Sequence, residues 1–166
     1  MGVVLIGFMG TGKSTVAKEL SGLLKMDIIE MDQQIVIQEG MEISEIFAKY
    51  GEEHFRNLET NLLKDMQKRE NVIISCGGGT PLRECNVVEM KKNGSVFLLT
   101  AKPETIWNRV KNNTDRPLLN GNMNVEYIES MMAKRKEKYE AAADYIIETD
   151  GKSVSDICKE IIEKMK

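Results

Sequence analysis

A run of nine residues near the amino terminus has the residue types and spacing needed to bind phosphate. Residues 7–15 read GFMGTGKST, which fits G-x-x-x-x-G-K-[ST] from Gly7 to Ser14. In such a loop, backbone N–H groups and a helix N-terminus face the phosphates of a nucleotide. Lys13 would reach the β- and γ-phosphates, and the Ser14 hydroxyl would ligate Mg²⁺. The pattern predicts that the chain binds a nucleoside triphosphate.

Two acidic residues and a run of glycines follow apolar segments further along the chain. Glu30 and Asp32 end the second apolar run, and alternation along a strand would put them on one face. Asp32 could cap the next helix, and a carboxylate here could also orient a hydroxyl, accept its proton or hold a water on Mg²⁺. Residues 75–81 read SCGGGTP, and glycines let the backbone approach a ligand closely. This segment is either a flexible turn or one wall of a substrate pocket.

Two arginines lie on or beside apolar helical faces. Arg135 falls on the apolar face of the segment 124–143, where an unpaired charge would be costly. An internal salt bridge would satisfy it, but the planar guanidinium favours recognition of a ligand carboxylate. Arg56 flanks the apolar face of the segment 52–69, with Glu59 three residues later. Taken alone, that spacing favours an exposed helical ion pair.

A segment without periodicity begins at residue 112 and is dense in turn residues. It could be an ordinary surface loop, but structureless stretches of this length in compact domains are often lids or binding loops. We predict a lid over about 112–124. A lid excludes water from a phosphoryl-transfer site, and Arg116 within it could act on the transferring phosphoryl group.

Apolar runs and amphipathic segments alternate along the chain, which indicates a parallel sheet covered by helices on both faces. In such sheets ligands bind at the carboxyl ends of the strands, where the residues discussed above would lie. The expected strands are 2–7, 28–31, 72–76, 95–100 and 145–149, and the expected helices are 14–25, 33–40, 43–50, 52–69, 82–92, 103–111, 124–143 and 153–165.

Composition narrows the class of protein. The length of 166 residues and 42% hydrophobic content predict a single globular domain over 1–166. No apolar run approaches the ~20 residues that span a bilayer, so we expect no membrane association. The net charge of −3 argues against a nucleic-acid partner. Three scattered cysteines fit a reducing cytoplasm, and Cys76 is expected to be a small core residue.

Taken together, the motifs resemble those of the shikimate kinase family. The matching pieces are GFMGTGKST, the EMD carboxylates, FRNLE, SCGGGT, TDRPLL and MAKRKEKY, in the family's order and spacing. The resemblance implies the P-loop NTPase fold, three α/β/α layers around a five-stranded parallel sheet, with a lid over the nucleotide. It also implies ATP- and Mg²⁺-dependent phosphorylation of the 3-hydroxyl of shikimate in the chorismate pathway to aromatic amino acids.

The resemblance also assigns roles to single residues. Substrate-binding helices are expected over about 33–61, and we expect a monomer. The family usually has aspartate where this chain has Glu30, so we leave Glu30 as an outer contact to the metal. Asp32 would bind shikimate hydroxyls and act in catalysis with Lys13 and Arg116. The remaining roles are as follows: Gly10, Thr11, Gly12, Lys13, Ser14 and Thr15 on the phosphates of ATP, Ser14 on Mg²⁺, Arg56 and Arg135 on the shikimate carboxylate, Gly78 against its ring, Arg116 on ATP, and Arg109 and Lys152 near adenine.

Two other functions stay open on the sequence. The chain could phosphorylate a different polyol acid such as gluconate, or it could be a nucleotide-binding module without transfer activity. The presence of Lys13, Ser14, Asp32 and Arg116 together disfavours the second alternative.

Overall fold

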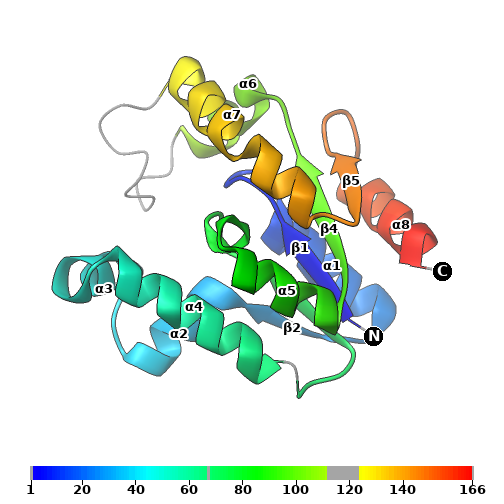
Figure 1. Ribbon diagram of the computed structural model, residues 1–166. Coiled ribbons are helices and arrows are strands. Elements are labelled where there is room, and N and C mark those ends of the chain that lie inside the picture. The colour runs from blue at the N-terminus through cyan, green and yellow to red at the C-terminus, as the bar shows by residue number, and fades with distance from the viewer. Residues whose placement is uncertain (1, 67, 112–123, 166) are drawn as a thin grey trace.

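A parallel sheet of five strands lies at the centre of the molecule, in a computed structural model that describes residues 2–66, 68–111 and 124–165 (Figure 1). The strand order is β2-β3-β1-β4-β5, and each neighbouring pair is parallel. The strands are β1 (Gly2–Ile6), β2 (Asp27–Glu30), β3 (Val72–Ser75), β4 (Gly94–Thr100) and β5 (Tyr145–Glu148).

Helices connect successive strands, as parallel pairing requires. They are α1 (Lys13–Leu24), α2 (Met31–Glu39), α3 (Ile43–Tyr50), α4 (Glu52–Met66), the 3₁₀ turn η1 (Thr80–Leu82), α5 (Glu84–Asn93), α6 (Pro103–Val110), α7 (Val125–Ala142) and α8 (Val154–Met165).

Alternating residues of the three central strands β3, β1 and β4 serve two hydrophobic cores on opposite faces of the sheet. On β1, Val4 and Ile6 join the core that includes side chains of α4, α5, α6 and α7. Val3 and Leu5 join the core formed with α1 and α8. Since a strand's side chains point alternately to its two faces, the sheet is the middle of three layers. Figure 1 shows α5 and α7 in front of the sheet and α1 behind it.

The strand order brings the two glycine-containing segments together. β1 occupies the centre of the sheet and leads into the loop of residues 7–12, while its neighbour β3 leads into residues 76–79. The adjacent strand β2 leads directly into α2. All three connections therefore begin at the same carboxyl edge of the sheet.

The predicted fold class is confirmed, with local differences. Helix α2 begins at Met31, so Asp32 lies in a helix and not at the end of a strand. Met31, the first residue of this helix, is fully buried. The helix predicted over 82–92 is split into η1 and α5. Of the predicted lid, residues 112–123, with Arg116, lie outside the described residues. Among the helices that the structure describes, none has the length and apolar character needed to span a membrane.

Candidate active site

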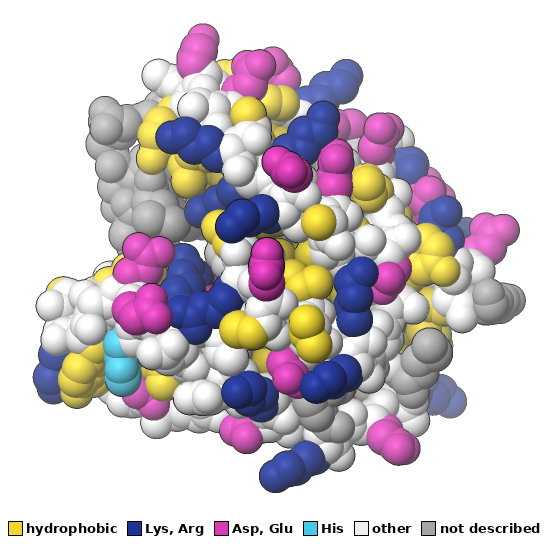
Figure 2. All heavy atoms as spheres, viewed as in Figure 1, with side chains coloured by type: hydrophobic (Ala, Val, Ile, Leu, Met, Phe, Trp, Pro, Cys, Tyr) yellow, Lys and Arg dark blue, Asp and Glu magenta, His cyan; other side chains and the backbone are white. Residues whose placement is uncertain are grey.

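A cleft of about 410 Å³ lies at the carboxyl edge of the sheet. Figure 2 shows a hollow on this side of the molecule, between the α3–α4 part and α7, with Lys and Arg side chains on both sides of it. The cleft joins the loop after β1 to the segments after β2 and β3. Its lining residues are Met9, Gly10, Gly12, Lys13, Ser14, Thr15, Glu30, Asp32, Gln33, Ser75, Cys76, Gly77, Gly78 and Arg109.

The loop between β1 and α1 has the backbone geometry that its glycines allow. Gly10 and Gly12 have φ of 79° and 93°, in the left-handed region that favours glycine. The hydroxyl of Thr11 is buried and donates to the Phe8 carbonyl at 2.8 Å, which fixes the middle of the loop. Helix α1 then starts at Lys13, so its N-terminus faces the cleft with the exposed hydroxyls of Ser14 and Thr15. This is a ready anion-binding arrangement.

Two cations contact carbonyl groups of this loop. Lys13 Nζ donates to the carbonyls of Gly7 and Phe8 at 2.7 and 3.1 Å. Arg109, from α6, donates to the carbonyl of Gly10 at 2.8 Å. Both positive charges therefore lie at the loop predicted to hold the triphosphate. The other residue predicted near adenine, Lys152, pairs with Glu160 at 3.0 Å and does not line the cleft.

Glu30 and Asp32 both line the cleft, although they do not share a strand face. Glu30 is the residue before α2, and Asp32 lies in its first turn. Neither side chain caps the helix, so the capping role considered for Asp32 is wrong. Asp32 is instead exposed to the cleft close to the segment after β3.

The oxygen donors at this edge fit Mg²⁺. Among the described residues, no cluster of three or more His, Cys, Asp or Glu side chains could hold a metal by itself. Mg²⁺ binds through one or two protein oxygens together with phosphates and water, so it needs no such cluster. The Ser14 hydroxyl and the carboxylates of Glu30 and Asp32 line the same cleft as the phosphate loop.

The glycine run 77–79 packs against three charged side chains at once. A Cβ on the first glycine would lie 2.8 Å from Asp32 Oδ1, and one on the middle glycine 3.2 Å from Arg135 Nη1. A Cβ on the third would lie 2.4 Å from Arg56 Nη1. The absence of side chains here lets these three groups, from three different helices, converge on one segment.

Arg56 and Glu59 form a largely buried pair, and the prediction of an exposed ion pair is wrong. Arg56 Nη1 donates to Glu59 Oε1 at 2.8 Å, and the Glu59 side chain is only 1% exposed. Thr80 Oγ1 donates to the other carboxylate oxygen of Glu59 at 2.6 Å. Burial raises the pKa of Glu59, opposed by the charge of Arg56 and the hydrogen bond from Thr80. An exposed carboxylate, Glu52, also contacts Arg56 at 3.4 Å.

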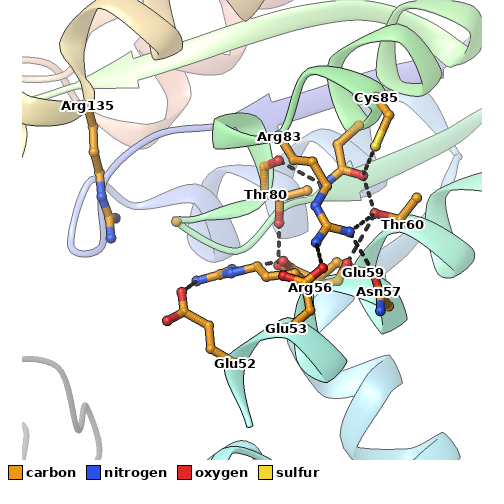
Figure 3. A network of polar contacts seen from close by, with 12 residues as sticks. Glu52, Glu53, Arg56, Asn57, Glu59, Thr60, Thr80, Arg83, Cys85 and Arg135 are labelled. Carbon is orange, nitrogen blue, oxygen red and sulfur yellow. Dashed lines mark hydrogen bonds and ion pairs between the residues drawn. The ribbon is translucent and has the colours of Figure 1, made fainter.

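The ion pair is the inner end of a longer polar network between α4 and the η1–α5 segment (Figure 3). Buried Asn86 accepts from Thr60 at 2.7 Å and donates to the Thr80 carbonyl at 3.0 Å. Arg83 reaches the same Thr60 hydroxyl at 3.2 Å. Because three of these hydrogen bonds join α4 to the η1–α5 segment, the network fixes the position of Arg56 relative to the glycine run.

Arg135 lies apart from this network and extends from α7 towards it (Figure 3). Its Nη1 donates to Tyr139 Oη at 3.3 Å, one helical turn away. Tyr139 in turn donates to the carbonyl of Gly78. Within the described part of the chain, no carboxylate lies at ion-pair distance from Arg135, so the internal salt bridge considered from the sequence is not found there. Its positive charge is therefore not balanced by a carboxylate among the described residues.

Several residues that organise the site were not found from the sequence. Thr80 and Asn86 gave no signal, because their partners are distant in the chain. Tyr139 could have been found, since it is four residues after Arg135 on the same helix face. Burial raises the pKa of Tyr139, which favours the protonated hydroxyl that donates the hydrogen bond to Gly78. Cys76 is buried, as predicted.

The model of the family described as shikimate kinase matches residues 9–166. The chain belongs to the shikimate kinase family. Shikimate kinases of Thermodesulfovibrio yellowstonii and Geobacter metallireducens are 40% and 43% identical to it, over 98% and 96% of this chain and 93% and 88% of theirs. The shikimate kinase of Acinetobacter baumannii, solved with shikimate, has a TM-score of 0.92 and 30% identity over 98% of this chain and 91% of its own.

Membership of the shikimate kinase family confirms the function predicted from the motifs. The protein is a phosphotransferase with an alcohol group as acceptor, and ATP is the phosphoryl donor of the family. The non-catalytic alternative is thereby set aside.

Proposed function

We propose that this protein transfers the γ-phosphoryl group of ATP to the 3-hydroxyl of shikimate in the cleft at the carboxyl edge of the sheet. The observation that carries the proposal is the convergence of Asp32, Arg56 and Arg135 on the glycine run 77–79. The first two glycines of that run, Gly77 and Gly78, line the same cleft as the phosphate loop. A small acid with hydroxyl groups fits this arrangement. Its carboxylate would pair with the two guanidinium groups, a hydroxyl would bond to the carboxylate of Asp32, and its ring would lie against the glycine backbone.

The acceptor carboxylate would bind between the two arginines. Arg135 has no internal carboxylate partner among the described residues, whereas Arg56 shares its charge with Glu59 and Glu52. Arg135 therefore supplies most of the unbalanced positive charge for the ligand. Arg56 supplies a guanidinium whose orientation is already fixed, which reduces the entropy lost on binding.

The donor phosphates would lie over the loop of residues 10–15, at the N-terminus of α1. Lys13 would exchange its contacts with loop carbonyls for the β- and γ-phosphate oxygens. Mg²⁺ would be held by the Ser14 hydroxyl, with Glu30 as an outer contact, and would neutralise phosphate charge. Arg109 is placed at the loop for the nucleotide, and Arg116 would act from the predicted lid. Lys152 stays a prediction for the adenine end.

Transfer would consist of one bond forming as another breaks. The acceptor hydroxyl oxygen bonds to the γ-phosphorus while the bond from that phosphorus to the bridging oxygen of ADP breaks. The transition state of phosphoryl transfer is loose, so orientation and charge neutralisation supply most of the catalysis. Asp32 would hold the hydroxyl in line and accept its proton late in the reaction.

We also propose that the chain acts as a single catalytic domain and as a cytoplasmic monomer. All proposed donor and acceptor residues come from one chain, so a second copy is not needed to complete the site. The three free cysteines, two of them buried, suit a reducing compartment. Light scattering coupled to gel filtration would measure the mass, and a dimer at assay concentrations would contradict the monomer.

The proposed substrate is tested by ADP release with shikimate, with gluconate and with buffer alone. We expect release to require shikimate, and equal rates with gluconate would contradict the assignment. Arg135→Ala and Arg56→Ala should each weaken shikimate binding with little change for ATP, and the loss should be larger for Arg135. Losing one partner of a desolvated ion pair costs about 2–5 kcal/mol. Arg69→Ala is a control, because Arg69 is exposed and pairs with Asp27 away from the cleft.

A further inference from the structure

Arg135 is held weakly by the polar contacts around it. Its one hydrogen bond in the described structure goes to the neutral hydroxyl of Tyr139 at 3.3 Å, near the long limit for such a bond. An arginine side chain loses about 2 kcal/mol of rotamer entropy when it is fixed. One long hydrogen bond to a neutral group is therefore too weak to offset the entropy lost when the Arg135 side chain is held in one orientation.

Arg135 also lies against the ring of Phe8. The guanidinium carbon lies 5.6 Å from the ring centroid, within the range for attraction between a cation and an aromatic face. Phe8 is 2% exposed, so the ring is itself held by the core that α7 covers. Arg135 therefore lies between a fixed aromatic face and the Tyr139 hydroxyl.

Phe8 also belongs to the phosphate loop through its backbone. Its carbonyl accepts hydrogen bonds from Thr11 at 2.8 Å and from Lys13 at 3.1 Å. The backbone of Phe8 thus contacts the loop proposed to bind ATP, while its ring lies against Arg135, which is proposed to bind shikimate.

We propose that Phe8 is a positioning residue for the acceptor: its ring holds the Arg135 guanidinium in the orientation that binds the substrate carboxylate. This inference rests on the proposed function, which gives Arg135 that ligand. Phe8 does not bind the acceptor itself and acts through Arg135. The phosphate loop therefore contributes to recognition of the acid as well as of the nucleotide.

A simple core role for Phe8 makes a different prediction, because leucine or methionine would fill the space nearly as well. Neither residue offers an aromatic face to the cation. We expect Phe8→Leu to raise both Kd and KM for shikimate by roughly three- to thirtyfold, the range of cation–π energies. The KM for ATP should change less than about twofold, since the backbone carbonyl contacts remain.

Phe97→Leu is the matched control. Phe97 is fully buried like Phe8, but it lies in the core on the other face of the sheet. Both variants should lose stability in urea unfolding, and only Phe8→Leu should lose shikimate affinity. Phe8→Met supplies a second test if the leucine variant is too unstable to assay. Equal shikimate affinity in wild type, Phe8→Met and Phe8→Leu would overturn the proposal.

A double-mutant cycle separates this inference from the proposed function. In an Arg135→Ala background, Phe8→Leu should cause no further loss of shikimate affinity, because the group that Phe8 positions is gone. A full additional loss in that background would show that Phe8 acts by another route and would overturn the inference. If Arg135→Ala alone left shikimate binding unchanged, the carboxylate role of Arg135 would fail, and the inference with it. Weak binding in Arg135→Ala with normal binding in Phe8→Leu would reject the inference only.

Discussion

Arg56 donates a hydrogen bond of 2.8 Å to Glu59 on the same helix, and the Thr80 hydroxyl donates to the other oxygen of the same carboxylate. Thr80 is at the start of η1, immediately after the glycine run. The pair therefore joins α4 to the turn that follows β3. An arginine proposed to bind the acceptor is in this way oriented before any acceptor arrives.

Glu59→Gln should destabilise the protein and weaken the acceptor site together. The amide keeps the shape but leaves the largely buried Arg56 without its main countercharge. Hydrogen bonds to charged groups contribute about 1.5–3 kcal/mol, and we expect a loss of that size in urea unfolding. The KM for shikimate should rise while that for ATP stays constant. Glu53→Gln, whose side chain is 82% exposed, should change stability by less than about 1 kcal/mol. An equal loss of unfolding free energy in the two variants would contradict the view that the buried position of Glu59 makes its ion pair stabilising.

Gly79→Ala should damage acceptor binding through side-chain contact and not through backbone strain. The new Cβ would lie 2.4 Å from Arg56 Nη1, and Gly79 has an ordinary φ of −92°. The guanidinium would have to move, so we expect a higher KM for shikimate with an unchanged KM for ATP. Gly22→Ala, in α1 with open space around its Cβ, should instead stabilise by up to about 1 kcal/mol. An unchanged KM for shikimate in Gly79→Ala would show that the position of Arg56 does not matter.

Asp32→Asn should keep the fold and ATP binding but lose most transfer activity. Asparagine cannot accept the hydroxyl proton and bonds the hydroxyl less strongly, so kcat should fall at least ~10²-fold. The loss of stability should be small, about 1 kcal/mol or less, because the side chain of Asp32 is exposed to the cleft and asparagine keeps its shape. Full activity would remove this carboxylate from the reaction.

Glu30→Gln should act mainly through the metal. We expect the Mg²⁺ concentration for half-maximal rate to rise, with a smaller fall in the maximal rate, because Glu30 is proposed as an outer contact. The measurement is a Mg²⁺ titration of activity beside wild type and Asp32→Asn. Identical damage in both variants, with no change in Mg²⁺ dependence, would mean that the two roles are wrongly divided.

Asp150→Asn should lower stability at neutral pH and leave it unchanged in strong acid. The hydrogen bond from the Thr105 hydroxyl, followed by that from the Lys102 backbone N–H, holds the pKa of Asp150 below its usual 3.8. A lowered carboxyl pKa stabilises the fold above the unfolded-state value and loses that effect as pH falls through the folded-state value. Urea unfolding at several pH values should therefore show the two proteins converging below about pH 4. Asp27→Asn, with a side chain 82% exposed, is the control. A constant difference down to the lowest pH would contradict this account.

The sheet and the phosphate loop could be predicted because their signals are local. Apolar runs mark the strands, and the spacing of Gly7, Gly12 and Lys13 marks the loop. The burial of Glu59 could not be predicted, since it depends on packing against distant residues such as Thr80, 21 residues away along the chain. The start of α2 was missed for a related reason: Met31 is drawn into the core, and the helix begins with it. Side-chain roles that depend on packing between distant segments are the part that sequence patterns do not contain.

The glycine run 77–79 would limit how the protein could become resistant to an inhibitor of the acceptor site. The glycines themselves offer such a compound no side chain that mutation could shorten or remove. Any larger residue would place a Cβ 2.4 to 3.2 Å from Arg56, Asp32 or Arg135. A substitution that expelled the compound would therefore also displace a group proposed to hold the substrate. Resistance would arise more readily at exposed cleft residues such as Gln33, whose side chain no proposed step requires.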